Sequence, residues 1–220
     1  MSIDDRLASV RKEIGDGVTL VAVSKTKPVE DITEAYTAGQ RVFGENKVQE
    51  LVGKYEALPK DIQWHLIGHL QSNKVKYIAP FVALIHSVDS LKLLAEINKQ
   101  ALKNERTIDC LLQFHVATEE TKFGLNLTEA KELLRSAEYK MMQNIRIVGV
   151  MGMASFTENQ DLIHQEFQTL KSLFNELKNN EFSSSKAFTE ISMGMSGDYQ
   201  IAIEEGSTMI RLGSTLFGTR

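Results

Sequence analysis

Two lysines, Lys25 and Lys27, follow directly on the apolar run LVAVS (20–24). Lysine is rarely buried, so a lysine at the end of a core strand is either solvated or held in a pocket. A desolvated amine, or one beside a second cation, loses its proton more easily and can then add to an aldehyde as a Schiff base. The stretch therefore offers Lys25 as a candidate nucleophile with Lys27 as its neighbouring cation, and a solvated strand end as the alternative.

Two stretches near the C-terminus combine glycine with hydroxyl residues: SMGMSGD (192–198) and RLGSTLFG (211–218). The first precedes the short helical pattern YQIAIEEG, and the second continues an apolar strand pattern. Backbone N–H groups at such turns bind anions, and glycine lets the anion approach closely. A phosphate site is therefore predicted here, with Arg211 beside it. A ligand with both an aldehyde and a phosphate would suit this arrangement.

Other polar residues lie at the ends of predicted strands: Asn46 after the second, His69 at the end of the third and Lys122 after the fifth. Several further residues have a structural interpretation. His65 and His86 lie inside strand patterns, as hydrogen-bonded structural histidines do. Asp89 is predicted to cap the helix that follows it. The methionines at 151, 153, 193 and 195 are interpreted as core filler.

Composition excludes several classes of function. The 220 residues carry a net charge of −4, which gives no footprint for nucleic acid or an anionic membrane. The single cysteine, Cys110, lies in an apolar run and is interpreted as a core residue, and no metal site is expected. Residues 3–14 have the spacing of an amphipathic helix and not of a signal peptide. A cytoplasmic protein without a membrane span is expected.

Short apolar runs alternate with helical patterns along the whole chain. Strands are predicted at 18–24, 41–45, 63–69, 82–88, 109–116, 146–152, 187–192 and 207–213. Helical patterns between them include 29–39, 90–104 and 162–180. Such alternation favours parallel pairing, and about eight units predict a single (β/α)8 TIM barrel over residues 1–220. An open doubly wound sheet is the alternative. In a barrel, the polar residues above would gather at the carboxyl ends of the strands.

Five segments together resemble the pyridoxal phosphate homeostasis protein family, formerly labelled proline synthetase co-transcribed proteins. They are AVSKTKP (22–28), FGENKVQE (43–50), WHLIGHLQSNK (64–74), ETKFGL (120–125) and residues 192–220. The resemblance implies a barrel related to the N-terminal domain of alanine racemase. It also implies pyridoxal 5′-phosphate (PLP) bound as a Schiff base on Lys25.

The resemblance further implies roles for other residues. Ser196, Gly213 and Ser214 would hold the phosphate, with Ser192 and Thr215 as further candidates. Arg211 would face the pyridine nitrogen, where an arginine keeps that nitrogen unprotonated and the ring a poor electron sink. Residues expected to line the mouth of the site are Asn46, His69, Lys122 and Met151.

Two positions depart from the family pattern. His115, in the run FHVA, stands where the family commonly has asparagine, which could change the charge near the ring. Gly152, in the run VMGMA, stands where a larger residue such as threonine is expected, so a slightly larger pocket is predicted.

Binding a cofactor is not catalysis, which requires groups that stabilise a transition state. Alanine racemase takes a second base from a tyrosine of another domain and partner subunit, and this chain ends at Arg220, so we expect no such domain. The favoured interpretation is a monomeric protein that buffers, carries or delivers PLP, with PLP-dependent apo-enzymes as possible partners. One alternative is a weak amino-acid racemase or another PLP enzyme of the aminotransfer type, with Lys25 as one base and Lys122, His69 or His115 as the other. A second is a Schiff-base aldolase acting on a sugar phosphate.

Overall fold

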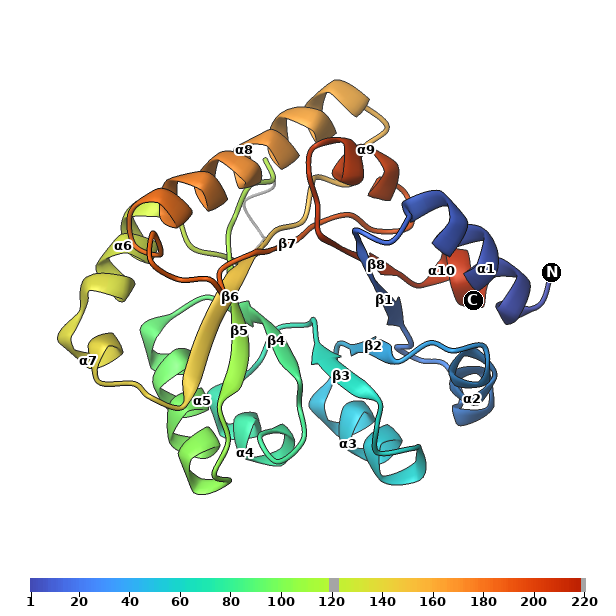
Figure 1. Cartoon of the computed structure of the whole chain (residues 1–220), viewed down its shortest axis with the longest axis horizontal. Helices are drawn as coiled ribbons and strands as arrows, with labels where there is room; N and C mark the ends of the chain where they lie inside the picture. The colour runs from blue at the N-terminus through green and yellow to red at the C-terminus, as the bar shows by residue number, and fades with distance from the viewer. Residues whose placement is uncertain (119–122, 219–220) are drawn as a thin grey trace.

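The computed structural model describes residues 1–118 and 123–218. Eight parallel strands pair in sequence order, and β1 also pairs with β8, so that the sheet closes on itself (Figure 1). The strands are β1 (Thr19–Val23), β2 (Val42–Glu45), β3 (Gln63–Leu66), β4 (Leu84–Val88), β5 (Ile108–Gln113), β6 (Ile145–Met151), β7 (Glu190–Ser192) and β8 (Met209–Leu212). This closure confirms the predicted (β/α)8 barrel and excludes the open doubly wound sheet.

Helices surround the barrel on its outer face (Figure 1). They are α1 (Ile3–Ile14), α2 (Val29–Thr37), α3 (Val48–Ala57), α4 (Val75–Ile78), α5 (Leu91–Lys103), α6 (Leu127–Arg135), α7 (Ala137–Lys140), α8 (Gln160–Asn179), α9 (Tyr199–Glu204) and α10 (Ser214–Phe217), with the 3₁₀ turn η1 (Ser72–Lys74). In the described residues, no helix has the length and apolar character needed to cross a bilayer.

Apolar side chains form two separate cores. The larger core lies between the strands and the surrounding helices. The smaller one draws its members from five strands, and they alternate along those strands with members of the larger core; they are Val21, Leu84, Leu111, Val148, Met151 and Met209. Successive residues of a strand face opposite sides of the sheet, so this second set fills the barrel interior. Among the described residues, the barrel interior is thus a packed core and not an open channel.

The N-terminal helix α1 follows its sequence pattern closely. Ile3, Leu7, Val10 and Ile14 are buried, and the helix packs on α2 and α10. A capping box begins the helix, in which the Ser2 side chain accepts from the Asp5 N–H and Asp5 accepts in return from the Ser2 N–H. The predicted amphipathic helix over residues 3–14 is confirmed.

Several strand ends and one helix cap were predicted wrongly. The third strand ends at Leu66 instead of residue 69, and the seventh begins at Glu190 instead of residue 187. The fifth strand ends at Gln113 instead of residue 116, because its last ladder partner on β6 is Met151. The N-cap of α5 is Ser90, whose side chain accepts from the Leu93 N–H, and not Asp89. The N-cap is the residue directly before the first helical one, and Asp89 lies one position too early.

Candidate functional site

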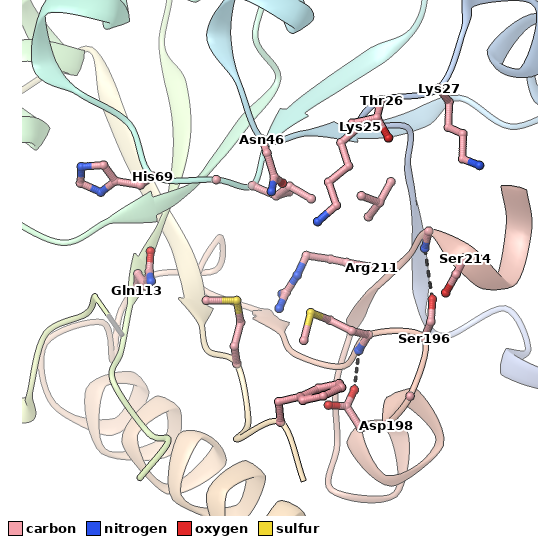
Figure 2. Close-up of a pocket in the computed structure, with 18 of the residues that line it drawn as sticks. Lys25, Thr26, Lys27, Asn46, His69, Gln113, Ser196, Asp198, Arg211 and Ser214 are labelled. Carbon is pink, nitrogen blue, oxygen red and sulfur yellow. Dashed lines mark hydrogen bonds between the residues drawn. The ribbon is translucent and has the colours of Figure 1, made fainter. Parts of the chain in front are cut away.

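A cavity of about 650 Å³ opens at the carboxyl ends of the strands (Figure 2). Its lining includes Lys25, Lys27, Asn46, His69, Gln113, Ser196, Asp198, Arg211, Gly213 and Ser214. The formal charges among the Lys, Arg and Asp side chains are three positive and one negative. Such an excess of positive charge suits an anionic ligand.

Lys25 reaches the cavity from the loop after β1. Its side chain points into the cavity toward Arg211, whereas that of Lys27 points away (Figure 2). The Lys27 Nζ instead donates to the carbonyl oxygens of Phe217 and Gly218, at 3.1 and 3.3 Å. The positive φ of Thr26, 64°, turns the chain between the two lysines. The loop therefore presents one amine to the cavity and uses the other to hold the end of α10.

A buried ion cluster supports this loop from behind. The Lys54 Nζ lies 2.7 Å from each of three oxygens: the Ser24 carbonyl, Glu45 Oε1 and Glu50 Oε1. Glu45 also accepts from the Ser24 hydroxyl at 2.6 Å, and Glu50 accepts from the Thr26 N–H. Burial raises the pKa of Glu45, although Lys54 and Ser24 oppose that shift. The cluster thereby anchors the residues on both sides of Lys25.

The two glycine-rich loops meet at Ser196. Its Oγ accepts from the backbone N–H groups of Gly213 and Thr215, at 3.3 and 3.4 Å (Figure 2 draws the first). Two N–H groups that converge on one oxygen can also donate to a phosphate oxygen placed there. Ser214 and Gly197 complete this wall of the cavity. Four of the predicted phosphate-binding residues, Ser196, Gly213, Ser214 and Thr215, are thus brought together at one side of the cavity. Ser192 is not among them, because it is buried and bonded to Arg211.

Replacing Ser196 by alanine is expected to weaken binding of a phosphate-bearing ligand about 10- to 100-fold, because a hydrogen bond to a charged group is worth about 1.5–3 kcal/mol. The measurement is a fluorescence titration with PLP. The control is Ser172→Ala, which changes an exposed serine of α8 whose hydroxyl donates to the Gln168 carbonyl of the same helix. Equal affinities for the two variants would remove Ser196 from the phosphate site.

Arg211 lies beneath the cavity at the start of a buried polar row. Its guanidinium donates to the Ser192 hydroxyl and, at 3.1 Å, to the Gly152 carbonyl. The Ser192 Oγ lies 3.0 Å from His86 Nδ1, and His86 Nε2 lies 3.0 Å from His65 Nδ1. Burial lowers the pKa of Arg211 to about 10 and that of His65 to about 3, and it also holds the pKa of His86 well below 6.5. The interpretation of His65 and His86 as hydrogen-bonded structural histidines agrees with these contacts.

This histidine pair is expected to make the fold sensitive to acid. Both rings are neutral when folded and regain a pKa near 6.5 when unfolded, so below about pH 6.5 the unfolded chain binds protons that the folded chain does not. The free energy of unfolding therefore decreases as the pH falls below about 6.5. The decrease is up to about 1.4 kcal/mol per pH unit for each histidine.

The measurement is urea unfolding between pH 6.5 and 4.5, compared with the double variant His65→Gln/His86→Gln. The raised pKa of Glu45 acts in the opposite direction, but it is common to both proteins and cancels in the difference. Parallel pH profiles would show that the folded protein tolerates charge on the pair.

Of the other predicted site residues, some lie at the mouth of the cavity and others lie outside its lining. Asn46 and His69 lie at the mouth, where the His69 ring stacks on Phe123 with centroids 4.5 Å apart. Met151 is buried in the barrel interior and is not among the residues that line the cavity. His115 is exposed beyond the end of β5, outside the cavity lining. Lys122 lies outside the described residues.

Gly152 does not enlarge the cavity, contrary to the prediction. A Cβ on this residue would come within 2.9 Å of the Leu170 side chain on α8, so the missing side chain faces the helix layer. The reason is strand alternation: Met151 points into the barrel, and its neighbour therefore points outward.

The interpretation of the methionines as core filler was wrong for Met195, which is 37% exposed. Met153 is only partly buried, and both methionines line the cavity.

Sequence reasoning missed several residues of the site. Gln113 and the two phenylalanines 123 and 156 line the cavity, and Phe156 is almost fully exposed. Gln113 could have been found as the polar residue that ends an apolar run, had the strand not been extended to residue 116. Lys54 left no signal, because a lysine within a helical pattern is normally solvated.

Comparisons with known proteins show the family to which the chain belongs. The model of the family described as "Alanine racemase, N-terminal domain" matches residues 1–220. A pyridoxal phosphate homeostasis protein of Aquifex aeolicus is 44% identical, over 91% of this chain and 86% of its own length. The human protein of the same name is 40% identical, over 91% of this chain and 76% of its own length.

Solved structures of similar proteins indicate the same family and fold. PipY of Synechococcus elongatus is 36% identical, with 99% of this chain and 100% of PipY covered; its TM-score is 0.91 without PLP and 0.87 with PLP bound. Alanine racemase of Clostridium difficile shares the fold at 12% identity and a TM-score of 0.81, with 57% of its chain covered. The chain therefore belongs to the alanine racemase N-terminal domain family and, within it, to the pyridoxal phosphate homeostasis proteins.

Proposed function

We propose that this protein binds PLP covalently on Lys25 and acts in the homeostasis of that cofactor, by buffering, carrying or delivering it. The observation that carries the proposal is one cavity in which the Lys25 amine and the Arg211 guanidinium lie opposite two converging N–H groups. The PLP-bound structure of PipY and the names of the curated relatives support it.

Each wall of the cavity suits one part of the cofactor. Ser196, Gly213 and Ser214 offer hydroxyl and N–H donors to the phosphate, with the Thr215 N–H beside them. Lys25 is within the same cavity to react with the aldehyde. Ser192 is fully buried and bonded to Arg211, so it acts through Arg211 and not on the phosphate.

The proposal does not include robust catalytic turnover of a substrate. When bound, PLP supplies an aldehyde that forms Schiff bases with amines and a ring that can withdraw electrons. Arg211 has only donors and stays charged at neutral pH, so it leaves the ring nitrogen without a proton and limits that withdrawal. His69, at the mouth, is one candidate second base for the alternative of a weak racemase.

The test of PLP binding is peptide mass spectrometry after borohydride reduction of protein incubated with PLP. A pyridoxyl phosphate adduct on the peptide that contains Lys25 is expected. An unmodified Lys25 in excess PLP would contradict the proposal and return attention to a phosphosugar aldolase. Incubation of the loaded protein with L- and D-amino acids then tests turnover, and racemisation above the rate of free PLP would establish an enzyme.

The proposed functional unit is one domain, residues 1–220, acting as a monomer in the cytoplasm. Light scattering coupled to gel filtration tests the monomer, and cell fractionation tests the location. Delivery to PLP-dependent apo-enzymes is tested by reactivating an apo-aminotransferase while a phosphatase destroys free PLP. Reactivation by loaded protein but not by an equal amount of free PLP supports direct delivery, and equal failure of both contradicts it.

A further inference from the structure

Four buried polar side chains form a row across the barrel interior, beneath the cavity. Arg211 of β8 contacts Ser192 of β7, Ser192 contacts His86 of β4, and His86 contacts His65 of β3. All four residues are at most 5% exposed. Only Arg211 reaches the cavity lining, so the binding of a ligand does not directly explain the other three.

The donors of arginine, together with the need of each buried proton for an acceptor, set the direction of the hydrogen bonds in this row. A guanidinium has five donors and no acceptor, so the Ser192 oxygen must accept from it. The Ser192 hydroxyl has one proton, and His86 Nδ1 is the acceptor available to it among the described contacts, so we take that nitrogen to be unprotonated. His86 carries its proton on Nε2 and donates to His65 Nδ1, so His65 too is protonated on Nε2.

Two other arrangements keep the same contacts: His86 protonated on both nitrogens, or both histidines neutral with the proton on Nδ1, so that Ser192 accepts from His86 as well as from Arg211. Either one leaves the Ser192 proton without an acceptor among the described contacts, and the first also places a second positive charge beside the buried Arg211. The titratable groups that influence this row are His65, His86, Arg211 and, from the cavity wall, Asp198. Burial and the like charge of Arg211 both oppose protonation of His86.

We propose that Ser192, His86 and His65 are positioning residues, which hold Arg211 in place and keep it the sole positive charge beneath the cavity, with both histidines as neutral Nε2–H tautomers. This inference rests on the proposed function, because the group positioned by the row is the one that faces the ring nitrogen of PLP. The row thus sets the electronic state of the bound cofactor through Arg211 without touching the cofactor.

The first test needs no cofactor. Nitrogen NMR of ¹⁵N-histidine-labelled protein without PLP is expected to show His65 and His86 with Nε2 protonated and Nδ1 unprotonated, unchanged between about pH 5.5 and 8. An Nδ1–H tautomer or a charged ring for either residue would overturn the proposal. This result stands whether or not PLP binds, so failure of the inference and failure of the proposed function are distinguishable.

The second test uses variants of His86. His86→Leu removes the acceptor for Ser192 and is expected to weaken PLP binding about tenfold and to shift the absorption band and pH profile of the bound cofactor. His86→Gln, with an acceptor and a donor, is expected to restore both. The control, His164→Gln, changes a histidine on the outer helix α8 that contacts Glu205.

Binding and spectra of His86→Leu that match those of the control would refute the positioning role. If His86→Leu does not fold, the positioning role is still tested by comparing His86→Gln with the wild type and by the tautomer spectra. A glutamine variant with altered spectra, together with wild-type tautomers other than Nε2–H, would also refute it.

Discussion

Replacing Lys25 by alanine is expected to abolish the pyridoxyl phosphate adduct that borohydride traps in the wild-type protein. Lys25 presents its amine to the cavity, whereas the amine of Lys27 is engaged with two carbonyl oxygens and points away (Figure 2). A Schiff base needs a free amine lone pair, which an ammonium group that donates to carbonyls does not offer. Adduct occupancy should therefore fall to background, measured by intact and peptide mass.

The matched variant is Lys27→Ala, which removes the neighbouring lysine and should leave the adduct on Lys25. It also removes the contacts to Phe217 and Gly218, so a moderate loss of PLP affinity is expected with the site of attachment unchanged. An adduct that persists in Lys25→Ala, on Lys27 or on another peptide, would show that the cavity does not select its amine by position.

The eight strands could be predicted because their apolar runs are short, regularly spaced and separated by amphipathic helices. The strand ends were less predictable. His115 was placed in the fifth strand because the apolar run continues through Phe114 to Val116, but the ladder with β6 stops at Gln113. Ladder length depends on the neighbouring strand, which a local pattern does not contain.

The candidate site could be predicted where one loop carries its own chemistry. Lys25 and the glycine-rich loops are such cases, since a lysine after a core strand and glycines beside hydroxyls are visible in the sequence. Contacts between loops were not visible. The Ser196 oxygen meets N–H groups about 17 and 19 residues further along the chain, and Gly152 faces α8 because of the register of β6.

Lys54 is the clearest residue that the sequence did not reveal. Within VQELVGKYEA it occupies an ordinary helical position, yet its side chain is only 8% exposed. The three oxygens it contacts come from the end of β1, the end of β2 and its own helix. Only closure of the barrel brings these three together.

Replacing Lys54 by methionine is expected to lower the free energy of unfolding by about 3–5 kcal/mol, because it leaves the buried Glu45 carboxylate without its compensating charge. Glu45 is fully buried, and its second oxygen, Oε2, has no hydrogen-bond partner among the described residues. The measurement is urea unfolding at neutral pH. The control is Lys99→Met, a lysine 61% exposed and 3.7 Å from Glu96, whose loss should change stability by less than about 1 kcal/mol.

Two further results separate the charge of Lys54 from its packing. The double variant Glu45→Gln/Lys54→Met contains no buried charge at this position and should recover part of the lost stability. The single replacement Lys54→Met should also slow the reaction of Lys25 with PLP. The reason is that the Ser24 carbonyl loses its contact with Lys54, and Glu50 loses the partner that holds it against Thr26. A Lys54→Met protein as stable and as reactive as Lys99→Met would mean that the loop of Lys25 holds its shape without the ion cluster.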